Sequence, residues 1–126
     1  MNTVVVALGS NIAPKENIPK AKEILANQYK LLAESGFITT KPFGDVQQPD
    51  FLNGAVLLQT SLSLDQLKSG LKKIEGSLGR GPLNRKGPRT IDLDIVIWND
   101  KIIDPDFYER DYLKQAALEL MPNLKY

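Results

Sequence analysis

The sequence predicts one α+β domain, spanning residues 1–126, in which amphipathic helices pack against a mainly antiparallel sheet. A chain of 126 residues is long enough for one hydrophobic core without disulfides or a structural metal. Apolar residues make up 42% of the chain and charged residues 25%, which is ordinary for a globular protein. Strand-like segments also alternate with segments whose apolar residues recur at spacings of three and four, the spacing of a helix packed on a sheet.

The N-terminal part of the chain is predicted to form a strand, a helix and a second strand. Residues 3–8 are mostly apolar, which indicates a buried strand. Pro14 begins a helix, because proline is favoured in a first turn, and the apolar stripe of this helix extends to about Ala33. Gly36 ends the helix, and a brief strand is expected over residues 37–40.

The remaining elements alternate in the same way. Residues 53–60 are predicted to be a strand, and Ser63 with Gln66 has the spacing of a capping box that opens a helix. That helix carries its apolar residues at spacings of three and four: Leu64, Leu67, Leu71, Ile74 and Leu78. A strand follows over residues 91–98, and a last helix begins near Asp106. This order is the ferredoxin-like βαββαβ core with an added C-terminal helix, and we expect the helices on one face of the sheet.

Composition excludes several classes of function. The chain has no cysteine and no histidine, which rules out disulfides, thiolate chemistry, a Ser-His-Asp triad and any zinc site built on histidine. A net charge of +1 argues against a broad nucleic-acid-binding surface. No apolar run is long enough for a transmembrane helix, and no signal peptide is apparent, so the expected location is the cytoplasm, away from membranes.

Two aspartates in the strand over residues 91–98 form the clearest chemical feature. Asp92 and Asp94 are two positions apart, so a strand points both side chains to one face, about 7 Å apart. The opposite face is predicted to carry Ile91, Leu93, Ile95 and Ile97. Like charges so placed repel each other unless a cation lies between them. A hard divalent cation with oxygen ligands, above all Mg²⁺, suits this pair.

Arginines gather just before the aspartates. Of 16 basic residues only four are arginines, and three of them, Arg80, Arg85 and Arg89, lie within ten positions. A guanidinium presents several donors in a planar fork that matches phosphate oxygens, so this segment is predicted to bind phosphate. The alternative is that Arg85, Lys86 and Arg89 belong to a solvated loop and that the aspartates line an exposed strand face.

Phe51 and Asn53 suggest a site for a flat heterocycle. The two residues are two positions apart, so an extended chain presents an aromatic ring and an amide on the same side. The ring can stack on a heterocycle while the amide donates and accepts hydrogen bonds at its edge. The alternative is that Phe51 is a core residue and Asn53 a turn residue.

Three segments of the chain together resemble a known family. They are Leu8-Gly9-Ser10-Asn11, then Gln48-Pro49-Asp50-Phe51-Leu52-Asn53, then Gly87-Pro88-Arg89-Thr90-Ile91-Asp92-Leu93-Asp94. In order and spacing they resemble the 6-hydroxymethyl-7,8-dihydropterin pyrophosphokinases of folate biosynthesis. The resemblance implies a ferredoxin-like fold, ATP as co-substrate and Mg²⁺. It also implies transfer of pyrophosphate from ATP to the pterin hydroxymethyl oxygen, with release of AMP.

The resemblance assigns roles on the phosphate side of the reaction. Asp92 and Asp94 would bind two Mg²⁺ ions that bridge the ATP phosphates, and Asp94 would assist deprotonation of the substrate hydroxyl. Arg80 and Arg89 would act with Asp94 as catalytic residues by holding phosphate oxygens. The resemblance assigns nucleotide contacts to Glu75, Ile95 and Arg110 as well as to these two arginines.

On the pterin side, the resemblance implies a ring held between Phe51 and Tyr112. Asn53 would bind the amide edge of that ring, and Thr40 and Phe43 would contribute backbone groups. A monomer acting on small molecules is expected.

The sequence departs from the family pattern at a few positions. Lys86 stands where the family commonly has tryptophan, Pro82 replaces a loop arginine, and the histidine that precedes the last arginine is absent. These departures leave a second hypothesis, a protein that binds pterin or nucleotide without turnover. A third is an RNA-binding module, since βαββαβ is also the layout of the RRM, but the strands lack the aromatic run of that module.

Overall fold

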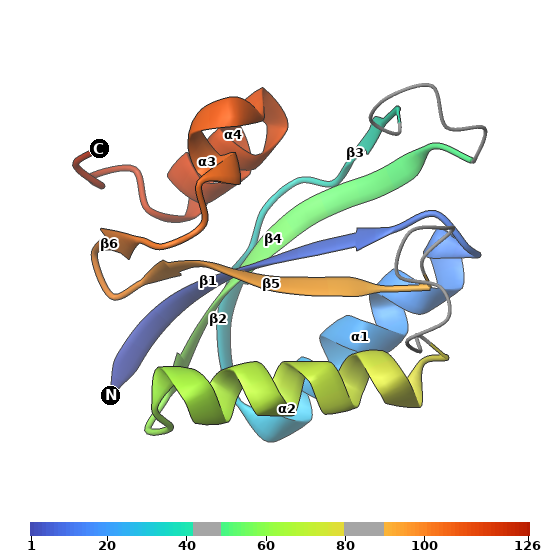
Figure 1. The fold of residues 1–126 in the computed structure, drawn as a ribbon, viewed down its shortest axis with the longest axis horizontal. Coiled ribbons are helices and arrows are strands. Elements are labelled where there is room, and N and C mark those ends of the chain that lie inside the picture. The colour runs from blue at the N-terminus through green and yellow to red at the C-terminus, as the bar shows by residue number, and fades with distance from the viewer. Residues whose placement is uncertain (42–48, 80–89) are drawn as a thin grey trace.

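The computed structural model describes residues 1–41, 49–79 and 90–126 of the chain (Figure 1). The strands in the described ranges are β1 (Asn2–Ser10), β2 (Lys30–Glu34), β3 (Ile38–Thr40), β4 (Phe51–Thr60), β5 (Asp92–Trp98) and β6 (Lys101–Ile102). The helices there are α1 (Pro14–Gln28), α2 (Leu64–Ser77), α3 (Asp106–Glu109) and α4 (Asp111–Leu120).

The strands form one sheet in the order β2-β4-β1-β5-β6, and the strand pairs found in it are antiparallel. Strand β4 lies between β1 and β2, the two strands that α1 connects, and β5 lies on the other side of β1. This is the split arrangement of a ferredoxin-like core, so the predicted α+β fold class is confirmed. Strands β2 and β3 follow each other along one edge of β4, where β2 pairs with residues 56–59 and β3 with residues 51–53.

Helices cover both faces of the sheet, whereas the sequence led us to expect them on one face only. Figure 1 shows α1 and α2 on one side and α3 and α4 on the other. The reason is visible in β1, where the consecutive residues Val4, Val5 and Val6 are all fully buried. A strand whose two faces are both apolar has to be covered on both sides.

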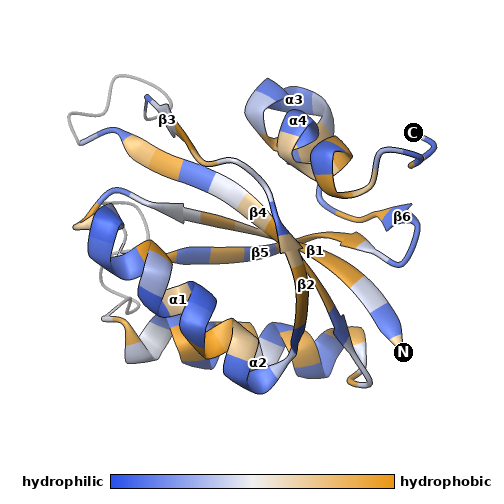
Figure 2. Cartoon of the chain, turned by 180° about the vertical axis from the view of Figure 1, so that it is seen from behind, coloured by the Kyte–Doolittle hydropathy of each residue, from blue (hydrophilic) through white to orange (hydrophobic). Residues whose placement is uncertain are grey.

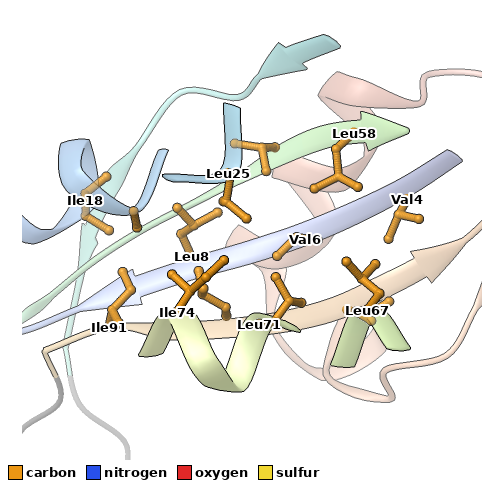
Figure 3. Close-up of a cluster of buried hydrophobic side chains, with 14 residues drawn as sticks. Val4, Val6, Leu8, Ile18, Leu25, Leu58, Leu67, Leu71, Ile74 and Ile91 are labelled. Atoms are coloured by element: carbon orange, nitrogen blue, oxygen red, sulfur yellow. The ribbon is translucent and has the colours of Figure 1, made fainter. Parts of the chain in front are cut away.

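The larger of the two cores lies between the sheet and helices α1 and α2 (Figure 3). This α1–α2 core consists of Val4, Val6, Leu8, Ile18, Ala21, Leu25, Val56, Leu58, Leu67, Leu71, Ile74, Ile91, Leu93 and Ile95. Helix α2 packs on this core and begins with the predicted capping box. In that box the Ser63 hydroxyl accepts from the backbone N–H of Gln66, and the Gln66 side chain accepts from the N–H of Ser63. Hydrophilic residues face outward on α1 and α2 (Figure 2), as burial of the opposite stripe requires.

The second core lies under helices α3 and α4. This α3–α4 core consists of Val5, Ala55, Val96, Ile97, Phe107, Leu113, Ala116 and Ala117. The sequence predicted one last helix, but the structure has two, α3 and α4. Arg110, with an extended backbone (φ −123°, ψ 109°), separates α3 from α4.

The first helix ends earlier than the sequence pattern indicated. We expected it to continue to about Ala33, but α1 stops at Gln28, and Tyr29 is extended (φ −132°, ψ 169°). Residues Lys30–Glu34 pair with the outer edge of β4 instead. Leu32, near the end of the stripe that was predicted to extend to about Ala33, is 43% exposed. Strand pairing overrides helix propensity here, because a local sequence pattern does not contain the neighbouring strand edge.

The alternation along β5 is also interrupted. Between Val5 and Val6 the register of β1 with β5 shifts, so that one extra residue of β5 lies between Ile95 and Ile97. Ile97 accordingly packs in the α3–α4 core, and the prediction that it shares a face with Ile91 and Leu93 is wrong. A bulge of one residue reverses the facing of the residues beyond it.

Within the part of the chain that the structure describes, none of the helices has the length and apolar character needed to span a bilayer.

Candidate active site

Helices α3 and α4 cover one end of a face of the sheet. Polar side chains occupy the other end of the same face. In the register of the sheet, Gly9 pairs with Asn53 on one side and with Asp92 on the other. Directly paired residues of an antiparallel sheet present their side chains to the same face. Asn53 and Asp92 therefore flank Gly9 in one row across three strands, about 10 Å apart. In the next row, Ala7 pairs with Asp94.

The two aspartates lie as the sequence predicted. Leu93, between them, is buried in the α1–α2 core, while Asp92 is half-buried and Asp94 exposed on the opposite face. Among the described residues no group of three or more acidic, histidine or cysteine side chains could hold a metal ion. Asp92 and Asp94 could together hold a cation, with phosphate oxygens and water in its other coordination positions. That pattern fits Mg²⁺, which keeps several waters and is usually bound by one or two carboxylates together with phosphates.

Helix α2 fixes the strand that carries the aspartates. The Glu75 carboxylate accepts a hydrogen bond of 2.7 Å from the backbone N–H of Leu93. Strand β6 pairs with Ile97 and Trp98 of β5, so within the described residues no strand pairs with the outer edge of β5 at Leu93. Glu75 supplies the missing acceptor there and thereby holds the backbone between Asp92 and Asp94.

The amide of Asn53 is held from two sides. Its Nδ2 donates a hydrogen bond to the hydroxyl of Thr40, which pairs with Phe51 at the end of β3. Its Oδ1 lies over Gly9, where an added Cβ would meet it at 2.7 Å and would lie 3.9 Å from Cδ1 of Phe51. Thr40, Phe51 and Asn53, which the sequence assigned to one ligand, are thus neighbours.

Arg110 and Tyr112 lie together at the junction of α3 and α4. The Arg110 Nη1 donates to the Tyr112 hydroxyl at 3.3 Å, and its Nε lies 3.6 Å from Oδ2 of Asp106. Burial lowers the pKa of the Arg110 guanidinium, but the hydrogen bond with Tyr112 and the charges of Asp106 and Asp104 outweigh it, so the pKa lies above its usual value. Arg110 is therefore a permanent cation beside an aromatic ring.

Comparison with known proteins shows the family of the chain. The family model described as 7,8-dihydro-6-hydroxymethylpterin-pyrophosphokinase matches residues 5–122. The chain belongs to this family. It is similar to the 2-amino-4-hydroxy-6-hydroxymethyldihydropteridine pyrophosphokinases of Haemophilus influenzae and Pseudomonas aeruginosa. The first is 35% identical over 98% of this chain and 84% of the relative, and the second 39% identical over 97% and 82%. The enzyme of the same name from Aquifex aeolicus is 33% identical over 98% of this chain and 83% of the relative.

Seen as a pyrophosphokinase-family domain, the structure brings six of the predicted site residues to one end of the sheet: Thr40, Phe51, Asn53, Glu75, Asp92 and Asp94. Arg110 and Tyr112 lie together on the helices of the same face, and Ile95 lies on the other face. Ile95 is buried in the α1–α2 core, on the face opposite Asp92 and Asp94. Its side chain is therefore directed away from them, and any contact with a nucleotide would involve its backbone. Three further residues predicted for the site, Phe43, Arg80 and Arg89, lie outside the described residues.

Sequence reasoning gave no role to two residues that shape this site. Gly9 comes directly after the strand predicted over residues 3–8, yet β1 continues to Ser10 and Gly9 provides the space for the Asn53 amide. Asn11 is 3% exposed, and its Nδ2 donates to the backbone carbonyl of Pro49 at 3.2 Å. This bond ties the end of β1 to the residues that lead into Phe51. Both residues belong to the Leu8-Gly9-Ser10-Asn11 segment. The resemblance of this segment to the family was the feature of the sequence that could have pointed to them.

Proposed function

We propose that this protein transfers pyrophosphate from ATP to the hydroxymethyl oxygen of 6-hydroxymethyl-7,8-dihydropterin, giving AMP and the pterin pyrophosphate in folate biosynthesis. The observation that supports this proposal is the row of Asn53, Gly9 and Asp92 across three neighbouring strands. It places a group suited to a heterocycle edge and a group suited to a metal–phosphate complex on one rigid surface. A substrate that lies along this row would have its ring at Asn53 and its reacting hydroxyl toward Asp92 and Asp94.

We assign the phosphate end of the row to Asp92 and Asp94, as ligands of two Mg²⁺ ions. Bound there, magnesium neutralises the charge of the ATP phosphates and of the attacking and leaving oxygens. In the reaction the hydroxymethyl oxygen forms a bond to the β-phosphorus of ATP. The bond from that phosphorus to the oxygen bridging the α- and β-phosphates breaks, so that AMP leaves. Asp94, the more exposed of the two carboxylates, accepts the hydroxyl proton.

The remaining charge of the triphosphate is assigned to arginines. Arg110 is cationic like any arginine, its neighbours raise its pKa further, and it has a planar fork suited to phosphate oxygens. Arg80 and Arg89 are proposed as catalytic residues that act on the transferred group, and Glu75 and the backbone at Ile95 as further nucleotide contacts.

The pterin is assigned to the opposite end of the row. Phe51 and Tyr112 would stack on its two faces, Asn53 would bind its amide edge, and Thr40 and Phe43 would add backbone groups. Stacking of a flat heterocycle between aromatic rings, with an amide at its edge, gives both affinity and orientation. We propose a monomer that acts on these small molecules without a nucleic-acid partner.

Formation of AMP tests this proposal. The protein is incubated with ATP, Mg²⁺ and 6-hydroxymethyl-7,8-dihydropterin, and AMP and the pterin pyrophosphate are quantified together. Asp94→Asn, which keeps the shape of the side chain and removes its charge, should lower kcat by at least about 100-fold, the scale on which general base catalysis contributes. Asp100→Asn, an exposed aspartate in the turn after β5, is the matched control. Binding of both substrates to the wild-type protein without AMP would instead identify a protein that binds without turnover.

A further inference from the structure

We infer that Gly9 and Thr40 are specificity-determining residues that act through Asn53, by holding its amide so that the carbonyl oxygen faces the ligand. A site built in this way selects a heterocycle whose edge carries N–H donors over one whose edge carries only acceptors. The identity of the heterocycle rests on the function proposed above, whereas the arrangement of the three residues does not.

Thr40 engages the nitrogen of the amide. Ile38 of β3 pairs directly with Asn53, and Thr40 pairs with Phe51, so Thr40 is the diagonal neighbour of Asn53 across the two strands. Diagonal neighbours are within reach of longer side chains. The Nδ2 of Asn53 donates to the Thr40 hydroxyl, and this bond turns the nitrogen toward β3. The oxygen, at the other corner of the planar amide, is turned toward β1.

Gly9 supplies the space into which that oxygen fits. Oδ1 of Asn53 lies 2.7 Å from the position that a Cβ at residue 9 would occupy. Such a contact is closer than real Cβ atoms show, and Oδ1 is at the far end of the Asn53 side chain, so any other residue at position 9 would displace the amide. The backbone of Gly9 does not have a positive φ. Glycine is therefore required here for close approach and not for backbone conformation.

The two contacts together define what the site can recognise. The amide nitrogen is hydrogen-bonded to a residue of β3, and the amide oxygen comes close to β1 because Gly9 has no side chain. This oxygen is then an acceptor in the same row as Asp92. A ring N–H or exocyclic amino group, as on the amide edge of a pterin, is the complementary partner.

Binding measurements test the role of Thr40. Calorimetry is carried out with 6-hydroxymethyl-7,8-dihydropterin and, separately, with the ATP analogue α,β-methylene-ATP and Mg²⁺. Thr40→Val removes the acceptor for Nδ2 and should weaken pterin binding by about 3- to 10-fold, the range for loss of one hydrogen bond. Thr40→Ser keeps the hydroxyl and should bind within about 2-fold of the wild type. Thr39→Val makes the same change at the exposed neighbouring residue, whose side chain points to the other face, and should have no effect. Nucleotide binding should be unchanged throughout.

A double-mutant cycle tests the role of Gly9. Gly9→Ala should weaken pterin binding by about 10-fold or more, because the new methyl group would lie 2.7 Å from Oδ1 and push the amide away. In an Asn53→Ala background the same change should cost almost nothing, since no amide remains to be displaced. Gly36→Ala is the matched control, because a Cβ there has no neighbour within 4 Å. An equal loss from Gly9→Ala in both backgrounds, or equal behaviour of Thr40→Val and Thr40→Ser, would overturn the inference.

The ligand-free protein separates this inference from the proposed function. The side-chain NH₂ signals of Asn53 in NMR spectra should shift in Thr40→Val and in Gly9→Ala and remain in place in Thr40→Ser. If the wild type fails to bind the pterin but these shifts occur, the proposed function is wrong and the arrangement of the amide stands. If Asn53 signals are the same in all variants, the arrangement itself is refuted, whatever the protein binds.

Discussion

Replacement of Glu75 distinguishes two roles that the structure and the family resemblance assign to the same side chain. The resemblance makes Glu75 a nucleotide contact. The structure shows its carboxylate accepting the N–H of Leu93, between Asp92 and Asp94. If the second role dominates, Glu75→Ala should destabilise the protein in the absence of any ligand, because it leaves a backbone donor of a buried residue without its acceptor.

The expected size of this effect follows from the geometry. A hydrogen bond to a charged acceptor contributes about 1.5–3 kcal/mol, and Glu75 is only half-buried, so we take about 2 kcal/mol. For 126 residues the entropy of unfolding is about 0.26 kcal/mol/K, so Tm should fall by about 8 °C. Glu75→Gln keeps an oxygen acceptor without the charge and should lose about half as much.

The assay is thermal unfolding of the ligand-free protein, followed by steady-state kinetics. Lys73→Ala, an exposed position on the same helix, should change stability by no more than about 0.5 kcal/mol. In Glu75→Ala, kcat should fall as the backbone between the aspartates loosens. An unchanged Tm with a raised KM for ATP would refute this reasoning and leave Glu75 as a nucleotide contact alone.

Three further changes probe the core, a helix cap and the link between β1 and Phe51. Leu71→Ala removes a buried side chain from the α1–α2 core and should cost about 2–5 kcal/mol in urea unfolding; a loss below about 1 kcal/mol would contradict the observed packing. Ser63→Ala should cost about 1 kcal/mol, because it removes the hydroxyl that accepts from Gln66, whereas Ser61→Ala on the exposed loop should cost almost nothing. Asn11→Ala removes the bond to the Pro49 carbonyl and should raise KM for the pterin several-fold with a stability loss of about 1 kcal/mol; a loss of stability with unchanged KM would make Asn11 purely structural.

The sequence predicted those parts of the fold that depend on local pattern. The aspartate pair was placed correctly because side chains at i and i+2 of a regular strand share a face, and the bulge in β5 lies beyond Asp94. The capping box and helix α2 were found for a similar reason, since Ser63 and Gln66 act within a single turn. The wrong predictions depended on distant neighbours. Residues 30–34 are good helix formers, and only the open edge of β4 makes them a strand.

The candidate site shows the same division. Phe51 and Asn53 were found because their spacing is a property of one strand. The contribution of Gly9 could not be found, since it depends on which residue of β4 lies opposite, a matter of register between strands 44 positions apart. The position of Ile97 was missed for a related reason, because the bulge in β5 is defined by pairing with β1.

The position of the candidate site follows from where the second pair of helices stops. Along three adjacent strands, the face under α3 and α4 changes from apolar to polar in the same direction. On β4 it passes from Leu57 and Ala55 to Asn53, and on β5 from Ile97 to Asp94 and Asp92. Between these strands, β1 passes from Val5 to Gly9. The helices cover the apolar end, and the polar end remains in the same rigid sheet. Side chains held in this way need little reorganisation to meet a substrate, which is the condition under which positioning and electrostatics accelerate phosphoryl-type transfer.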